Sequence, residues 1–133
     1  MATLTELSDA VKAQAAGLSL SPVQVYFTDA VAPSYTDAPW VRITVNGDGV
    51  GDRLAGDTDY QELAIITITV QAAKNNRAAR LAIVEEVRQL FNRPPLPGVT
   101  FEFPSVTETN GPEPETWAQS IITIGASFWP MAA

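Results

Sequence analysis

The sequence predicts an α+β domain with a mixed, mostly antiparallel sheet and two helices packed on it. First, residues 60–91 join one long β-branched segment to one amphipathic helical segment. Second, apolar and polar residues alternate in four further segments, as they do in strands. Residues 4–16 are the one other segment with apolar residues at helical spacing. Third, the links between most of the strands look like hairpin connections. At 133 residues, a single domain covering residues 1–133 is expected.

The first element is a helix over residues 4–16. Thr3 and Glu6 have the spacing of a capping box, with Thr3 as the N-cap and Glu6 reaching back. Gly17 is placed to end the helix. The apolar stripe is narrow, so we expect this helix to lie on the surface of the domain; the stripe consists of Leu4, Leu7 and Val11.

Two short strands are expected next, over residues 23–27 and Trp40–Val45. In the second strand, Val41, Ile43 and Val45 point inward, because alternate residues of a strand face opposite sides of the sheet. The intervening residues contain two prolines and are expected to form a loop.

A segment rich in glycine and aspartate follows, over residues 46–59. It holds four glycines and four aspartates in 14 residues, which is long for a connection inside a compact domain. It lacks the Gly-Lys-Ser/Thr end of a phosphate-binding loop, and its aspartates do not have the spacing of an EF-hand. We therefore expect a solvated hairpin loop that is mobile in a lone subunit and becomes ordered against a neighbour.

The strand Tyr60–Ala73 is the clearest element in the chain. It is rich in β-branched residues, which suit a pleated and half-buried surface. One face carries Ile66, Ile68 and Val70. The other face carries Leu63, Ile65, Thr67 and Thr69.

A second helix is expected from Arg77 to Arg93. Asn75 and Asn76 precede it and are suited to cap its first turn, and Pro94 ends it. Apolar residues recur at helical spacing along it: Leu81, Ile83, Val84, Val87, Leu90 and Phe91.

The remaining elements are a short strand over residues 99–103, a polar turn over residues 107–115 and a long final strand from Trp117 to Trp129. The turn contains one glycine and two prolines together with acidic residues. We expect the glutamates of this turn to be solvated at the surface.

Composition excludes several classes of function. The chain has no cysteine and no histidine, which removes disulfides, thiolate nucleophiles and the usual proton carrier near neutral pH. Its net charge of −7 argues against wrapping nucleic acid. No apolar run reaches the roughly 18 residues of a membrane span, and no leader pattern is visible at the N-terminus, so an intracellular and soluble protein is expected.

No catalytic constellation is evident. Glu85 and Glu86 lie side by side on a helix face, and no pair of carboxylates can be assigned to one cleft. We expect no enzymatic activity, no cofactor and no metal site. The helix arginines Arg77, Arg80 and Arg88 could follow one helix edge, where they would pair with acidic neighbours or serve an interface.

The order of these elements resembles the lambda-type tail terminator (tail completion) proteins of long-tailed bacteriophages. The resemblance is carried by the helix from Leu4, the segment 46–59, the strand Tyr60–Ala73 with the helix that follows it, and the closing strand that ends in Phe-Trp-Pro. It covers most of the chain and carries no catalytic residues. Proteins of this family are small α+β domains of about this length.

The resemblance implies a ring, usually of six copies, on the head-proximal end of a finished tail tube. The ring would end tube polymerisation and offer a surface to the neck of the capsid. Implied partners are other copies of the chain, the tube protein and a neck or head-completion protein, in a virion assembled in the host cytoplasm. DNA would pass through the lumen without specific binding, since six copies would carry a formal charge of −42, six times −7.

Position in the chain and residue type indicate candidate contacts to another subunit or to the tube: Asp48, Asp52, Arg53, Leu54, Asp57, Tyr60, Arg77, Arg80 and Trp129. Three alternatives stay open. They are another phage neck or head-completion protein, a small-molecule-binding α+β domain with a pocket between sheet and helices, and an enzyme that uses carboxylates.

Overall fold

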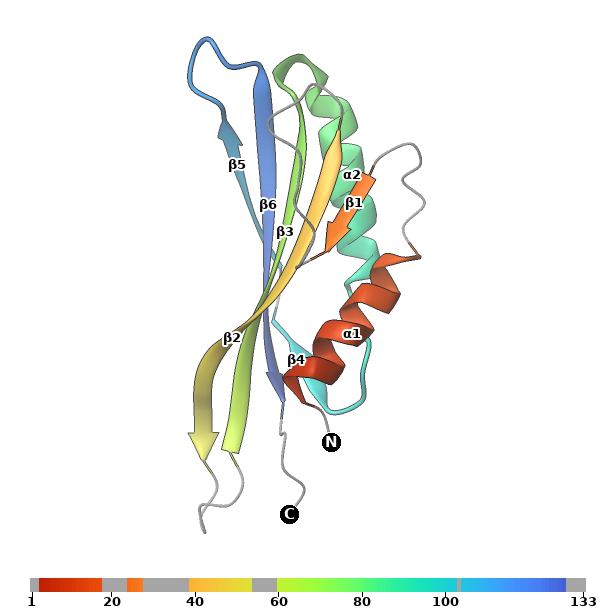
Figure 1. Cartoon of the computed structure of the whole chain (residues 1–133), viewed down its shortest axis with the longest axis vertical. Helices are drawn as coiled ribbons and strands as arrows, with labels where there is room; N and C mark the ends of the chain where they lie inside the picture. Colours follow the sequence, from red (N-terminus) through yellow and green to blue (C-terminus); the bar gives the residue numbers. More distant parts are fainter. Residues whose placement is uncertain (1–2, 18–23, 28–38, 54–59, 103, 129–133) are drawn as a thin grey trace.

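The part of the chain that the structure describes folds into a six-stranded mixed sheet with two α-helices, which confirms the predicted α+β class (Figure 1). The computed structural model describes residues 3–17, 24–27, 39–53, 60–102 and 104–128. The α-helices are α1 (Leu4–Ala15) and α2 (Arg77–Leu90), with a short 3₁₀ turn η1 (Lys74–Asn76) before α2. The strands are β1 (Gln24–Phe27), β2 (Trp40–Arg53), β3 (Tyr60–Ala73), β4 (Val99–Phe101), β5 (Ser105–Asn110) and β6 (Trp117–Phe128).

The strand order across the sheet is β1-β2-β3-β6, with β4 and β5 both paired to the far side of β6. β1 runs parallel to β2, and every other pairing is antiparallel. β4 pairs with the end of β6 and β5 with its beginning, so together they form one interrupted edge. Glu102 lies at the interruption, where its N–H donates to the Gly125 carbonyl at 2.8 Å.

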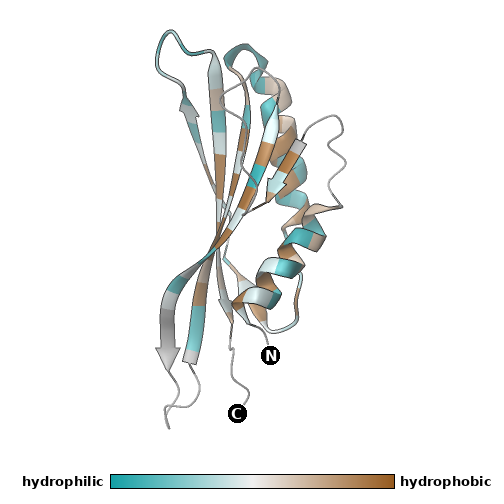
Figure 2. Cartoon of the chain, viewed as in Figure 1, coloured by the Kyte–Doolittle hydropathy of each residue, from teal (hydrophilic) through white to brown (hydrophobic). Residues whose placement is uncertain are grey.

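Both helices cover the same face of the sheet (Figure 1). Within residues 41–45, 63–70 and 117–128 the side chains alternate between buried and half-exposed, as a strand with one covered face requires. Figure 2 shows the hydropathy of the residues along these strands. The fully buried residues of this layer include Leu7 and Val11 from α1 and Val87 from α2. The strands contribute Val41, Ile43, Ile66, Ile68, Val70, Ile122 and Ile124, all with no exposed surface.

Helix α1 begins as predicted. The Thr3 hydroxyl accepts a hydrogen bond from the Glu6 N–H at 3.1 Å, and it donates to the Glu6 carboxylate at 3.2 Å. The predicted stripe packs on the sheet with Leu7 and Val11 buried, while Leu4 stays 37% exposed. Neither α-helix in the described ranges is long and apolar enough to cross a membrane.

Helix α2 begins at Arg77 as predicted, but its cap and its C-terminal end differ from the prediction. Asn76 makes no capping hydrogen bond, because the 3₁₀ turn η1 continues directly into the helix. The helix ends at Leu90 rather than Arg93, and the Phe91 side chain turns into the core with 1% of its surface exposed. The prolines at 94 and 95 therefore act beyond the helix end.

The prediction of a loop over residues 46–59 was wrong for its first half. β2 continues to Arg53, and Gly47, Val50 and Arg53 pair with Ala64, Glu62 and Tyr60 on β3. Each of the two intervals contains one extra residue on β2, so the strand carries two bulges. Gly49 adopts φ +91° in the first bulge, a conformation that glycine reaches without a steric penalty. Gly47 and Gly49 thus belong to a bulged strand. The lower ends of β2 and β3, from Gly47 and Ala64 to Arg53 and Tyr60, extend beyond the helices, and we call this part of the sheet the arm (Figure 1).

The prediction of a polar turn over residues 107–115 was also wrong in part. Residues 105–110 form strand β5, which pairs in continuous register with β6. All six residues are exposed, so the strand lacks the apolar alternation that identifies strands in a sequence. The turn proper occupies residues 111–116, and the Gly111 N–H closes it by donating to the Trp117 carbonyl at 2.9 Å.

The alternation of β3 gives a direct test of the fold. We expect Ile68→Ala to lower the free energy of unfolding by about 2–5 kcal/mol, because it leaves a cavity in the layer under the helices. The matched control is Thr69→Ala on the opposite, half-exposed face, which should cost less than about 1 kcal/mol. Urea unfolding followed by circular dichroism measures both. Equal losses for the two variants would contradict the assigned faces.

Candidate functional site

The face of the sheet away from the helices carries few charged side chains. Its positions within residues 40–47, 63–73, 105–110 and 117–127 include Arg42 as the one charged side chain, and Asp48 and Glu102 line a cavity on the same face. The rest are mainly threonine, serine and glutamine, with isoleucines at 65 and 121. The chain as a whole carries a net charge of −7, so this open face is unusual for the molecule. We call it the open face below.

The register across the sheet lines up side chains of one kind on the open face. Thr44, Thr67, Thr123 and Ser105 follow one another across β2, β3, β6 and β5. These hydroxyl groups can exchange hydrogen bonds with water or with a neighbouring surface, but they offer no charge to attract phosphate. Arg42 lies in the adjacent row, and its Nε has no hydrogen-bond partner within the part of the chain that the structure describes.

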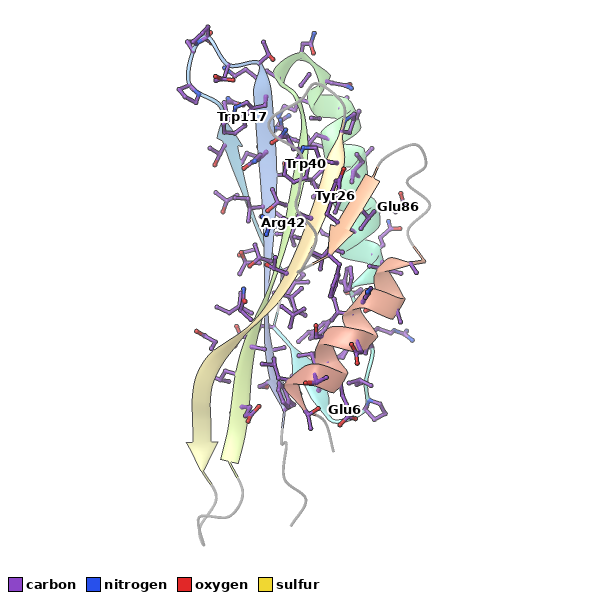
Figure 3. The ribbon with its side chains drawn as sticks, viewed as in Figure 1. Glu6, Tyr26, Trp40, Arg42, Glu86 and Trp117 are labelled. Carbon is purple, nitrogen blue, oxygen red and sulfur yellow. The ribbon has the colours of Figure 1, made fainter. Side chains whose placement is uncertain are left out.

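Aromatic and amide side chains occupy one end of the open face. Trp40 meets Tyr26 of β1 edge to face, with ring centroids 6.3 Å apart (Figure 3). Gln119 donates to Gln71 at 3.0 Å in the row that Trp40 begins. Trp117 packs against Gly111, where an added Cβ would lie 2.6 Å from its Cε2 atom. These contacts favour a structural role for Trp40 and Trp117.

An ion cluster ties the edge strand β5 to helix α2. Arg80 is 2% exposed; its Nε donates to the Ser120 hydroxyl at 3.0 Å and its Nη2 to the Glu108 carboxylate at 2.8 Å. Arg77 donates to both oxygens of the same carboxylate at 3.1 Å. The carboxylate therefore holds two guanidinium groups, one of them buried, and we call these three residues the clamp.

The clamp changes the pKa values of two of its members, Glu108 and Arg77. Hydrogen bonds from Arg77 and then Arg80 lower the pKa of the Glu108 carboxyl below its ordinary value of 4.5, against the opposing effect of desolvation. The hydrogen bond to Glu108 in turn raises the pKa of Arg77. A carboxyl whose pKa is lowered by folding stabilises the folded state above its ordinary pKa, and this stabilisation is lost as the pH falls through the lowered value.

The structure separates the candidate contact residues. Asp48 is exposed on the bulged part of β2. Asp52, Arg53 and Tyr60 belong to the strands of the arm by their backbone, and Arg53 pairs with Tyr60. Leu54, Asp57 and Trp129 lie outside the described residues.

The two arginines of the candidate set lie far from the arm, on α2. The interpretation of Arg80 as an exposed contact residue was wrong, since it is buried against β6 and needs Glu108 to balance its charge. Arg77 is exposed but pairs with the same carboxylate. The alternative that these arginines pair with acidic neighbours is confirmed. Sequence reasoning missed Glu108, because the spacing of residues 77, 80 and 108 shows no relation until β5 is recognised as a strand.

The cavities and acidic groups of the described part give little support to ligand chemistry. The apolar core occupies the space between the helices and β2, β3 and β6, and a hollow of about 360 Å³ lies beside it between α1 and β1, on the side where the small-molecule alternative expects its pocket. One cavity of about 370 Å³ lies on the open face beside Gly125, with Asp48 and Glu102 among its lining residues. No group of three metal-ligating side chains occurs within the described residues.

Two sheet edges remain without a partner strand among the described residues. β1 forms one edge, and β5 with β4 forms the other. Unpaired edges offer backbone N–H and C=O groups to another chain. These edges and the open face are the surfaces best suited to assembly.

Comparisons with known proteins found no matching family model and no matching curated protein. The two sheet edges and the open face are therefore the main basis for proposing a function.

The clamp can be tested by its pH dependence. We expect Glu108→Gln to lower the melting temperature at pH 7, because buried Arg80 loses its carboxylate, and the difference from the unchanged chain should shrink well below pH 4.5. The matched control is Glu113→Gln, which removes the exposed pair with Lys74 and should leave the melting temperature unchanged. A pH-independent effect of Glu108→Gln would contradict the clamp.

Proposed function

We propose that this protein is a structural virion protein that caps the head-proximal end of a phage tail tube as a ring of six copies. The observation that carries the proposal is the pair of edges without a partner among the described strands, on opposite sides of one sheet. Such edges allow each copy to contact the next head to tail, and heterologous contacts of this kind close into rings when the rotation fits. The resemblance in element order supplies the location in the tail.

The dimensions of the sheet suit a channel. Five strands lie side by side across the sheet, and strands are spaced by about 4.8 Å. Six copies joined through their sheets would have a circumference of about 145 Å and a diameter of about 45 Å between backbones. A ring of this width leaves room for a DNA duplex after the side chains are added.

The scarcity of cationic side chains on the open face suits the wall of such a channel. Phosphate binding requires clustered lysine and arginine, and the open face offers Arg42 alone in the strand ranges given above. The helices would then form the outer layer of the ring. DNA would slide past hydroxyl and amide groups without adhering.

The arm of β2 and β3 supplies a contact along the axis of the ring. It extends beyond the helices, and its paired region includes Asp48 and Glu62 as acidic residues and Arg53 as a basic one (Figure 1). An arm that projects from each copy would meet the tube or the neck. The candidate residues in its strands, Asp48, Asp52, Arg53 and Tyr60, thus remain proposed contacts, and Arg80 does not.

A tube-assembly experiment tests the function itself. We expect tubes of the cognate tail tube protein to stop growing when this protein is added, with extra density on one tube end in electron micrographs. Serum albumin at the same concentration is the control for non-specific coating. Tubes that lengthen at the same rate with this protein bound at neither end would contradict the terminator role. Binding to the neck instead would favour the neck-protein alternative.

A further inference from the structure

We propose that β5 of one copy pairs antiparallel with β1 of the next copy, so that the sheet continues across the subunit boundary and Val106 packs against Val25. We take the pairing partner to be a second copy of this chain because the proposed function, on which this inference rests, requires self-assembly. The inference concerns which strands meet, and it is tested separately from tube capping.

The exposed apolar residues lie on the two edge strands that this pairing joins. Val106 shares its row across the sheet with Phe27, so its contact with Val25 requires neighbouring copies to be offset by two residues along the strands. The large hydrophobic side chains exposed in the described part are Leu4 at 37%, Val25 at 39% and Val106 at 38%. Val25 lies on β1 and Val106 on β5, which are the two opposite edges of the sheet. Lone exposed valines are common, but one on each unpaired edge suggests a shared contact.

The two valines also share a face. Val25 is aligned with buried Val41 on β2, and Val106 with buried Ile122 on β6, so both side chains are on the helix side of the sheet. If β5 of one copy lies beside β1 of the next, the two side chains come to the same side of the extended sheet.

The strand directions allow the pairing without inverting a subunit. β1 runs with β2, β3 runs against β2, and β6 runs against β3. β5 runs against β6 and therefore against β1. Two copies placed side by side in the same orientation thus bring β5 and β1 together antiparallel, as a ring requires.

A hollow next to β1 can receive the incoming side chain. It has a volume of about 360 Å³ and lies between α1 and β1, lined by Lys12, Ala15, Ala16, Val25 and Phe27. Its walls are mostly apolar, and it opens on the helix side of β1. Val106 from a neighbouring β5 would enter it on that side.

Within the described residues, the paired segments β1 and β5 contain no proline and no bulge, although Glu102 and Pro104 interrupt the edge between β4 and β5. Charged residues, prolines and bulges normally guard sheet edges. β1 has the sequence QVYF, and the β5 sequence SVTETN pairs with β6 without a bulge. The one charge of β5, Glu108, is held by Arg77 and Arg80 of α2. The clamp therefore neutralises the one carboxylate of β5 that would otherwise disfavour pairing with a neighbouring strand.

The absence of cysteine makes a clean crosslinking test possible. A disulfide requires Cβ atoms about 3.5–4.5 Å apart, so it reports direct contact. We expect the full chain with both Val25→Cys and Val106→Cys to form a ladder of disulfide-linked copies under mild oxidation. Each single variant should stay uncrosslinked, and so should the control that joins Leu4→Cys with Val106→Cys.

Other results would overturn the inference. A Val106→Cys chain that forms dimers alone would show that two β5 strands meet, and a double variant no more crosslinked than the single variants would show that β5 and β1 do not meet. Crosslinked copies that leave tube growth unchanged would support the pairing and reject the terminator role. Tube capping without crosslinks would support the role and reject this pairing.

A second set of variants measures the contact without oxidation. Val25→Lys and Val106→Lys should each reduce the assembled fraction at least about tenfold, the effect of about 1.4 kcal/mol in contact energy. Leu4→Lys is the matched control, because Leu4 has nearly the same exposure but lies on α1. Native mass measurements follow the assembled fraction, and equal assembly by all three variants would contradict the pairing.

Discussion

The pairing of β3 with β6 is the constraint on which the rest of the structure depends. Their register is continuous over twelve residue pairs, from Glu62 with Phe128 to Ala73 with Trp117. Since alternate residues face opposite sides, a slip of one residue would move the buried isoleucines to the open face. Both helices then have a single apolar surface to cover. The same register sets the uncharged rows of the open face, so the core and the candidate channel surface are consequences of one pairing.

The clamp connects this core to the edge of the sheet. Arg80 is buried under β6, and its charge is balanced by a carboxylate on a strand that has no buried residue of its own. Leaving a buried guanidinium without its partner is costly, so α2 holds β5 in place through Glu108. An edge strand held in this way can remain regular and exposed, ready to pair with another chain.

Much of the fold follows from local patterns. The strand Tyr60–Ala73, both helices and the faces of β2 were predictable, because burial on one side imposes a period on the sequence. β5 was not, since an exposed edge strand needs no apolar period. The first half of the glycine-rich segment resembles a loop in sequence, because bulged strands and loops use glycine alike. The clamp joins residues that are distant in sequence, and it becomes visible only once β5 is placed beside β6.

The proposed ring rests on one sheet with two edges that lack a partner among the described strands, one face with few cationic side chains and an acidic chain. It requires that copies of this chain assemble into a closed oligomer. Light scattering over a range of protein concentrations, with and without Mg²⁺, measures this most directly. We expect one discrete mass, six times the 14.3 kDa of the chain, that does not grow further with concentration. A strict monomer at every concentration, or a mass that rises without limit, would contradict the closed ring.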